Sequence, residues 1–161
     1  MTIVSLFEDI CTKIGVHYSY GHIREVASTL AQYSQTIEYA NQKYPRVILI
    51  LDYPEDRTNV GYVGVRLQLL IVTNSDPTYK ADKRYNLNFV PILYPIYNKL
   101  IEAIKSSPYV DNMIIEHEKI DRYALSSALN ESILSDGRPL LNDNLDGIEI
   151  RNLNLKFINI C

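Results

Sequence analysis

Acidic side chains form the one arrangement in this sequence that could support catalysis. They fall into two groups, one after an apolar run and one in a later charged stretch: Asp52, Glu55 and Asp56, then Glu116 and Glu118. A restriction-type nuclease needs an acid and then Glu-x-Lys on the next strand, because carboxylate oxygens hold the divalent cation. The letters EHEK at 116–119 put the lysine one residue away from that spacing. We therefore expect a solvated loop and an exposed strand face, and keep a cytoplasmic metal-dependent nuclease using Asp52, Glu55 and Glu116 as the alternative.

Histidine, cysteine and glycine patterns indicate no further chemistry. The histidines are His17, His22 and His117, and the first two are separated by a predicted break in secondary structure. The sequence has no HExxH, no cysteine pair with metal spacing and no GxSxG. Cys11 falls on a core-facing stripe, which favours a packed thiol over a nucleophile. We expect a protein that is not an enzyme and has no metal or cofactor.

A small basic group stands in the middle of the chain. Lys80, Lys83 and Arg84 lie beside Tyr79 and Tyr85, a combination that can contact phosphate. Acids occur in the same stretch, which favours a mixed surface loop.

Length and composition indicate one self-sufficient domain over residues 1–161. The hydrophobic fraction is 47% and the charged fraction 22%, which is ordinary for a globular protein. The net charge of −3 argues against nucleic-acid binding driven by phosphate neutralisation, although DNA can pass nearby without tight binding.

Cys11 and Cys161 do not suggest a disulfide, which favours a reducing compartment. No signal peptide or membrane span is expected. The 13 tyrosines suit wet protein interfaces, although drift in an AT-rich genome would also produce them.

The first third of the chain predicts two helices and a short strand. Apolar residues at three- and four-residue steps predict a helix over 2–14, capped by Thr2 and ended by Gly15. Alternation predicts an extended segment at 16–21, and a second helix is expected over 22–33.

The middle of the chain predicts a strand pair with a long connecting loop. Residues 46–52 are apolar on both faces, which is typical of an interior strand. A charged loop at 52–60 leads to a strand at 61–73. Arg66 and Gln68 indicate that one face of this strand is exposed to solvent at one end. The two strands are expected to be antiparallel.

The remaining chain predicts a helix and two strands. A loop at 74–83 precedes a regular helix that begins at Pro91 or Pro95, since proline suits only the first turn, and ends near residue 106. A strand follows at 111–119, and a long connection spans 121–145. In the last strand, 146–160, the apolar parity changes between Ile150 and Leu153, which predicts a β-bulge at Arg151-Asn152.

These elements predict an α+β fold: a mainly antiparallel sheet of about four strands with two to three helices packed on it. The order of several motifs in this chain resembles that in the tail-terminator and head–tail connector (neck ring) proteins of tailed bacteriophages, including crAss-like phages. The motifs are YGHIREV, QKYPRVILILD, VRLQLLIVTNSDPTYKADKRY, VPILYPIYNKLIEAI and LDGIEIRNLNLKF. The resemblance covers residues 18–157. It implies a virion protein, assembled in the host cytoplasm, that forms a ring of its own copies around the DNA channel and joins portal, connector or tail proteins. It implies no catalytic residue and no membrane contact.

Contacts between subunits are expected at the loop 52–62, at the connection 121–145 and along the last strand. The last strand is expected to offer an edge to a neighbouring subunit. The residues expected at these contacts are Asp52, Glu55, Asp56, Arg57, Arg138, Ile148, Ile150 and Arg151. A third hypothesis is a host binding or immunity module that pairs through its sheet edge.

Overall fold

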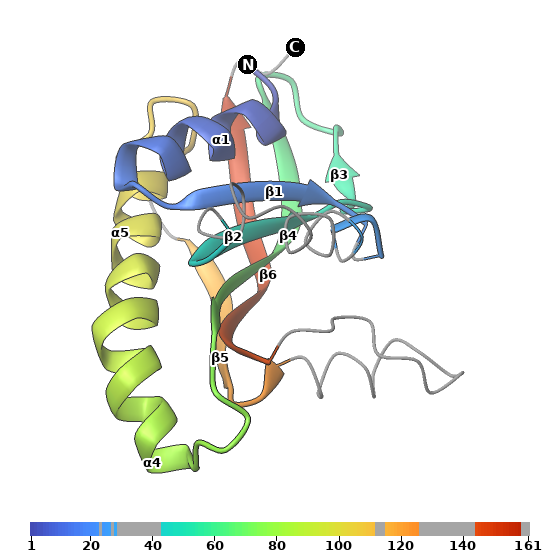
Figure 1. Cartoon of the computed structure of the whole chain (residues 1–161). Coiled ribbons are helices and arrows are strands. Elements are labelled where there is room, and N and C mark those ends of the chain that lie inside the picture. The colour runs from blue at the N-terminus through green and yellow to red at the C-terminus, as the bar shows by residue number, and fades with distance from the viewer. Residues whose placement is uncertain (23, 27, 29–42, 112–114, 126–143, 159–161) are drawn as a thin grey trace.

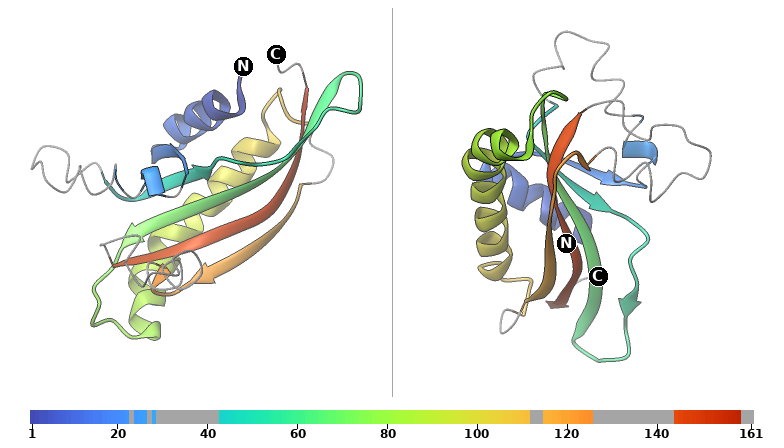
Figure 2. Two further views of the ribbon diagram at one scale, coloured as in Figure 1. Left: turned by 90° about the vertical axis from the view of Figure 1, so that its right-hand side faces the viewer. Right: turned by 90° about the horizontal axis from the view of Figure 1, so that it is seen from below.

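The computed structural model describes residues 1–22, 24–26, 28, 43–111, 115–125 and 144–158. Its elements run in the order α1 (Ile3–Ile14), β1 (His17–Gly21), β2 (Arg46–Ile50), β3 (Glu55–Asp56), β4 (Tyr62–Asn74), α4 (Ala81–Arg84), η1 (Tyr85–Leu93), α5 (Tyr94–Lys105), β5 (Glu116–Arg122) and β6 (Leu145–Ile158). The chain is α+β, with helices α1 and α5 packed on one face of a mainly antiparallel sheet (Figures 1 and 2).

The sheet has six strands rather than about four, in the order β1-β2-β4-β6-β5, with β3 paired to β4. β1 and β2 are parallel, and every other pairing is antiparallel. The predicted antiparallel pairing of the 46–52 and 61–73 strands is confirmed, and β2 is an interior strand as expected. The predicted loop at 52–60 contains the two-residue β3, which continues the sheet beside β4 beyond the end of β2.

The amino-terminal helix follows from local sequence. Thr2 and Ser5 form a capping box in which the Thr2 hydroxyl accepts from the Ser5 N–H at 3.1 Å. Gly15 ends the helix with a φ of 75°, a conformation that favours glycine. The apolar stripe, Cys11 included, is buried against the sheet, so the predictions of the helix, its caps and its buried face are confirmed.

The predicted start of the regular helix is confirmed, but the helical segment before it was not predicted. Regular α-helix does begin at Tyr94 with Pro95 in its first turn, but α4 and the π-helical η1 precede it, so helical backbone begins at Ala81. Pro91 lies inside η1, whose wider turns avoid the clash between a proline ring and the carbonyl four residues earlier. Buried Phe89 and Leu93 anchor this segment on the core.

The bulge in β6 lies where parity predicted it. Leu67 pairs with Leu153 and Leu69 with Ile150, so Arg151 and Asn152 together oppose Gln68. Asn152 has a φ of 51°, which adds local twist. The expectation that this strand is a free edge is wrong, because β4 and β5 pair with its two sides.

Three other expectations concern segments that the structure describes only in part. The strand predicted at 111–119 instead spans Glu116–Arg122, because residues through Arg122 pair with β6. Within the predicted helix 22–33, residues 24–26 and 28 are helical, residue 22 is not, and residues 23, 27 and 29–33 lie outside the described residues. Most of the connection 121–145 also lies outside them. No helix of the described part is both long and apolar enough to cross a bilayer.

The two faces of the sheet differ. The face toward α1 and α5 carries the main core, including Phe7, Leu69, Leu100 and Phe157. On the opposite face, one half is covered by a smaller apolar cluster that contains Ile48, Leu70, Val72, Leu125 and Leu145. The other half carries the polar side chains of Arg66, Gln68, Arg122, Glu149, Arg151 and Asn154 and is called the open face below.

Candidate functional site

The open face is organised around a buried carboxylate. Glu149 on β6 is only 3% exposed. Its Oε1 accepts from the Gln68 amide at 3.0 Å and from Arg151 Nε at 2.6 Å, and its Oε2 accepts from Arg122 Nε at 2.9 Å. Three neighbouring strands thus contribute to one polar network, because β4, β6 and β5 place these residues side by side.

The protonation state of Glu149 follows from opposing effects. Burial alone would raise the pKa of this carboxyl, because the charged form loses hydration. Hydrogen bonds from Arg151 and Arg122, together with their charges, outweigh burial and hold the pKa of Glu149 below its usual range. The carboxylate is therefore ionised at neutral pH, and it holds two guanidinium groups in place through hydrogen bonds to their Nε atoms.

Two cavities lie beside this network. The larger, of about 660 Å³, is lined by β3, β4 and β6 and by charged residues that include Glu55, Arg66, Glu116 and Lys156. The smaller, of about 260 Å³, is lined by Arg66 and Arg151 with Gln68, Asn152 and Asp52 among others. Arg66 lines both cavities, so a positive charge stands at their junction.

The three carboxylates of the nuclease alternative are only partly brought together. Glu55 and Glu116 line the larger cavity, whereas Asp52 lines the smaller one. Asp52 accepts from His22 Nδ1 at 2.8 Å. The described part of the chain contains no group of three or more histidine, cysteine, aspartate or glutamate side chains placed to hold a metal ion.

The predicted contact residues differ in accessibility. Glu55 and Arg57 form an exposed ion pair at 2.7 Å on the β3 hairpin, and Arg151 is 45% exposed on the open face. Ile148 and Ile150 are completely buried in the core, so their prediction as contact residues is wrong for this fold. Parity showed correctly that they share a face, but that face is covered by the chain's own helices.

The other predicted contact residues are Asp56 and Arg138. Asp56 accepts from the Thr58 hydroxyl at 2.6 Å and from its N–H at 2.9 Å, and these bonds lower the pKa of Asp56. Arg138 lies outside the described residues.

One end of the molecule carries a β-hairpin with an apolar tip. The hairpin joins β3 to the first residues of β4, and its turn contains Val60, whose side chain is fully exposed. The hairpin lies at the same end as the described chain termini (Figures 1 and 2). Its stem carries the acids Glu55 and Asp56, of which Glu55 is paired with Arg57. We call this the hairpin arm.

The opposite end carries exposed apolar and aromatic side chains that the sequence did not suggest. Tyr85, Leu87 and Val90 of η1 are each exposed by more than two fifths, and Tyr123 after β5 is nearly as exposed. The Tyr123 ring lies 4.4 Å from the buried Phe89 ring, which continues the patch into the core. We call these four exposed residues the η1 patch. A regular helix was expected to begin later, so this surface was not predicted.

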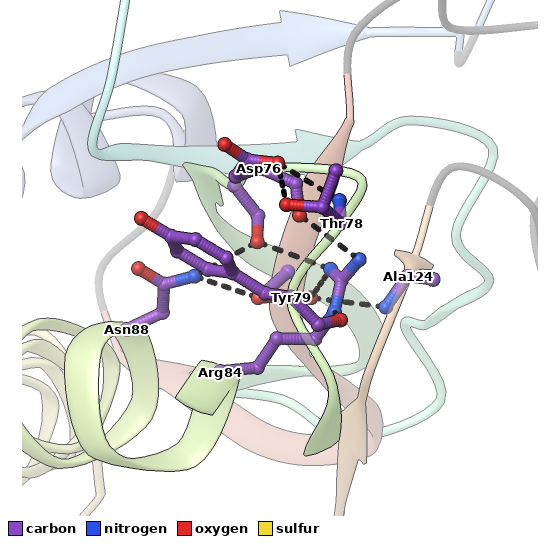
Figure 3. A network of polar contacts seen from close by, with 8 residues as sticks. Asp76, Thr78, Tyr79, Arg84, Asn88 and Ala124 are labelled. Atoms are coloured by element: carbon purple, nitrogen blue, oxygen red, sulfur yellow. Dashed lines mark hydrogen bonds and ion pairs between the residues drawn. The ribbon is translucent and has the colours of Figure 1, made fainter. Parts of the chain in front are cut away.

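A buried ion pair supports the η1 end. Asp146 accepts from Arg84 Nη1 at 2.6 Å and from the Asn88 amide at 2.7 Å, and the Ala124 N–H donates to the same carboxylate at 3.0 Å (Figure 3). Arg84 Nε also donates to the Tyr79 carbonyl, which ties the preceding loop to the helix. The expectation that the basic group forms a surface loop is therefore wrong for Arg84, which is buried because β6 supplies its counter-charge.

Two tyrosines of α5 have polar partners on the helix-facing side of β5. The Tyr94 hydroxyl donates to Asp121 at 2.5 Å, and the Tyr97 hydroxyl lies 2.6 Å from His117 Nε2. The hydrogen bond to Asp121, followed by burial, raises the pKa of Tyr94, and burial raises the pKa of Tyr97. Both phenols stay protonated at neutral pH, so they act as hydrogen-bonding groups that hold β5 to the helix.

No protein-family model, curated protein or solved structure matches the chain. The sequence singled out Arg151 and the hairpin residues, but it missed Glu149, Arg122 and the η1 patch. Alternating polarity at 145–151 was a usable signal for Glu149 and its near neighbour Arg151, whereas the partner Arg122 depends on strand order.

Proposed function

We propose that this protein is a structural ring subunit of a tailed-phage virion, at the head–tail junction or the tail end. The sequence resemblance suggests this role. The observation that carries it is the placement of two different surfaces, the hairpin arm and the η1 patch, at opposite ends of one subunit (Figures 1 and 2). Contacts between two different surfaces repeat from copy to copy and close into a ring when the rotation permits.

The two surfaces suit each other in polarity and charge. The hairpin arm presents Val60 at its tip and acids on its stem, and the η1 patch presents exposed apolar side chains. Exposed Lys80 and Lys83 lie just before the patch in the chain. An apolar tip placed on an apolar patch removes both from water, and the opposite charges orient the contact.

The proposed ring surrounds DNA and contacts portal, connector or tail proteins. A net charge of −3 gives no overall attraction for phosphates, which suits a channel through which DNA slides. In this proposal the remaining expected contacts, at Asp52 and along the connection 121–145, serve neighbouring subunits or stacked rings.

The test uses substitutions at the two ends, with size-exclusion chromatography, light scattering and negative-stain microscopy. Wild-type protein should form annuli. Val60→Asp places a charge at the tip of the hairpin arm, and Leu87→Asp places a charge in the η1 patch. Each variant alone should therefore be monomeric. Tyr20→Asp is the control, because Tyr20 is a large exposed side chain on β1, outside both surfaces.

An equimolar mixture of the two variants separates this arrangement from a symmetric dimer. The intact arm of Leu87→Asp can still bind the intact patch of Val60→Asp, but the resulting pair has no intact surface left. The mixture should therefore stop at dimers. Wild-type protein that stays monomeric at high concentration, or annuli that persist with Val60→Asp, would rule the proposal out.

A nuclease remains the second candidate, because Glu55 and Glu116 share a cavity with Lys156. Incubation of DNA with Mg²⁺ or Mn²⁺ tests it, with Glu116→Ala and Asp52→Ala as the comparison variants. If the wild-type protein cleaves DNA and Glu116→Ala does not, the nuclease function replaces the proposed structural role. A host binding module would use β1 or β5, the outer strands of the sheet, and neighbouring portal and capsid genes would argue against it.

A further inference from the structure

We infer that the smaller cavity of the open face is a phosphate-binding site formed by Arg66 and Arg151. Both arginines line this cavity of about 260 Å³, together with the side chains of Gln68 and Asn152. The cavity is also lined by Asp52, one of the expected subunit contacts, but it contains neither Val60 of the hairpin tip nor a residue of the η1 patch, so the variants that test the ring leave it unchanged.

Arg151 is oriented before any ligand binds. Its Nε donates to Glu149 Oε1 at 2.6 Å, and Glu149 is itself held by Gln68 and Arg122. Within the described structure its two Nη groups have no hydrogen-bond partner, and the side chain is 45% exposed. A guanidinium has five N–H donors in a rigid fork, so four remain for an oxyanion.

Arg66 is arranged in a similar way. Its Nε donates to Asn154 Oδ1 at 3.3 Å, and its Nη groups have no partner in the described part of the chain. Arg66 and Asn154 are opposite each other in the β4–β6 pairing, next to the bulge that carries Arg151. The bulge thus brings a second arginine, Arg151, to the cavity. In a regular strand the Arg151 side chain would point in a different direction.

The charge balance favours a small anion. Glu149 forms ion pairs with both Arg122 and Arg151, so these three residues together keep one positive charge, and Arg66 adds a second. Asp52 also lines the cavity and returns one negative charge, so the net charge is close to +1. One phosphate group, with several acceptor oxygens and about −1.5 to −2 charges as a monoester near pH 7, fits such a site.

The test is calorimetric titration with inorganic phosphate at low ionic strength. Arg66→Gln and Arg151→Gln should each weaken phosphate binding roughly tenfold or more, because each removes charge-assisted hydrogen bonds. Arg57→Gln is the matched control: Arg57 also donates through Nε to a glutamate, at 2.8 Å, but lines neither cavity. It should bind phosphate as the wild type does. Circular dichroism of each variant verifies the fold.

Two competition arms identify the source of the phosphate. If a short DNA duplex displaces inorganic phosphate and loses affinity in the same two variants, the ligand is a nucleic-acid backbone. If the duplex does not compete, the ligand is a small phosphorylated molecule. Either result supports the site.

Three results would overturn the inference: no saturable binding of phosphate by the wild type, equal affinities in wild type, Arg66→Gln and Arg151→Gln, or equal competition by acetate. Val60→Asp should bind phosphate normally, so failure of the ring and failure of this site are distinguishable.

Discussion

Replacing Asp146 with asparagine tests how strongly one buried ion pair holds the η1 end. Asp146 is completely buried and pairs with Arg84, whose side chain is only 9% exposed. Burial alone would raise the pKa of Asp146, but hydrogen bonds from the Ala124 N–H, Asn88, Arg84 and Ser75 lower it below its usual range. The carboxylate is therefore charged at neutral pH, and asparagine leaves the guanidinium without a counter-charge.

The expected loss is large relative to the stability of a domain this size. Removing one partner of a buried ion pair typically costs 3–5 kcal/mol, and because asparagine preserves shape and part of the hydrogen bonding we expect about 3 kcal/mol. Domains are stable by roughly 5–15 kcal/mol, so this is a substantial fraction. The midpoint of thermal unfolding should fall by roughly 6–12 °C.

The pH dependence gives a second readout with a defined sign. The folded-state pKa of Asp146 lies below the unfolded value of about 3.9, so its stabilisation is complete above that pH and is lost as the pH falls through the folded pKa. Wild-type stability should therefore fall more steeply below about pH 4 than that of Asp146→Asn. Urea unfolding followed by circular dichroism measures both quantities.

Two comparisons make the result decisive. Asp56→Asn also removes a carboxylate that accepts two hydrogen bonds, but on an exposed turn, so its effect should be much smaller. Arg84→Met should be far less damaging in the Asp146→Asn background than in the wild type, because the charge to be neutralised is then absent. If Asp146→Asn and Asp56→Asn lose the same free energy of unfolding, the reasoning about the buried pair is wrong.

Three further predictions concern the backbone and the buried thiol. Gly147→Ala should destabilise the fold by about 1–3 kcal/mol, since its Cβ would lie 2.8 Å from the Ile71 carbonyl oxygen; unchanged urea unfolding would contradict this. At Asn152, whose φ is 51°, valine should cost about 1–2 kcal/mol in thermal unfolding and glycine little, and equal effects would show that the bulge conformation is not the cause. Burial raises the pKa of Cys11 to about 12, so in Cys161→Ser protein at pH 8 a thiol reagent should modify Cys11 only after unfolding, and rapid modification of folded protein would refute its burial.

The local features of the fold could be read from the sequence because each depends on neighbouring residues. The Thr2 cap, the Gly15 stop and the apolar stripe of α1 follow from helix geometry alone. The bulge at Arg151-Asn152 follows from parity, since an extra residue is the local way to restore a strand's buried face.

The features that were missed depend on segments far apart in the chain. Pro91 disfavours a regular helix, yet burial of Phe89 and Leu93 against the sheet supports a helical backbone there as wider π turns. The candidate site was found only in part for the same reason. Arg151 was singled out, and Glu149 lies two residues before it on β6, but Arg122 reaches Glu149 only because β5 pairs with β6.

The sequence by itself determined α1, the regular helix α5 and the strands β2, β4 and β6, with their apolar faces, because capping, proline geometry and side-chain periodicity act over a few residues. The tertiary structure alone decided that β6 is central, that Arg84 is buried with Asp146, and that the hairpin arm and the η1 patch lie at opposite ends. Strand order and charge pairing join residues many positions apart. The free energy of those contacts comes from partners that no local pattern specifies.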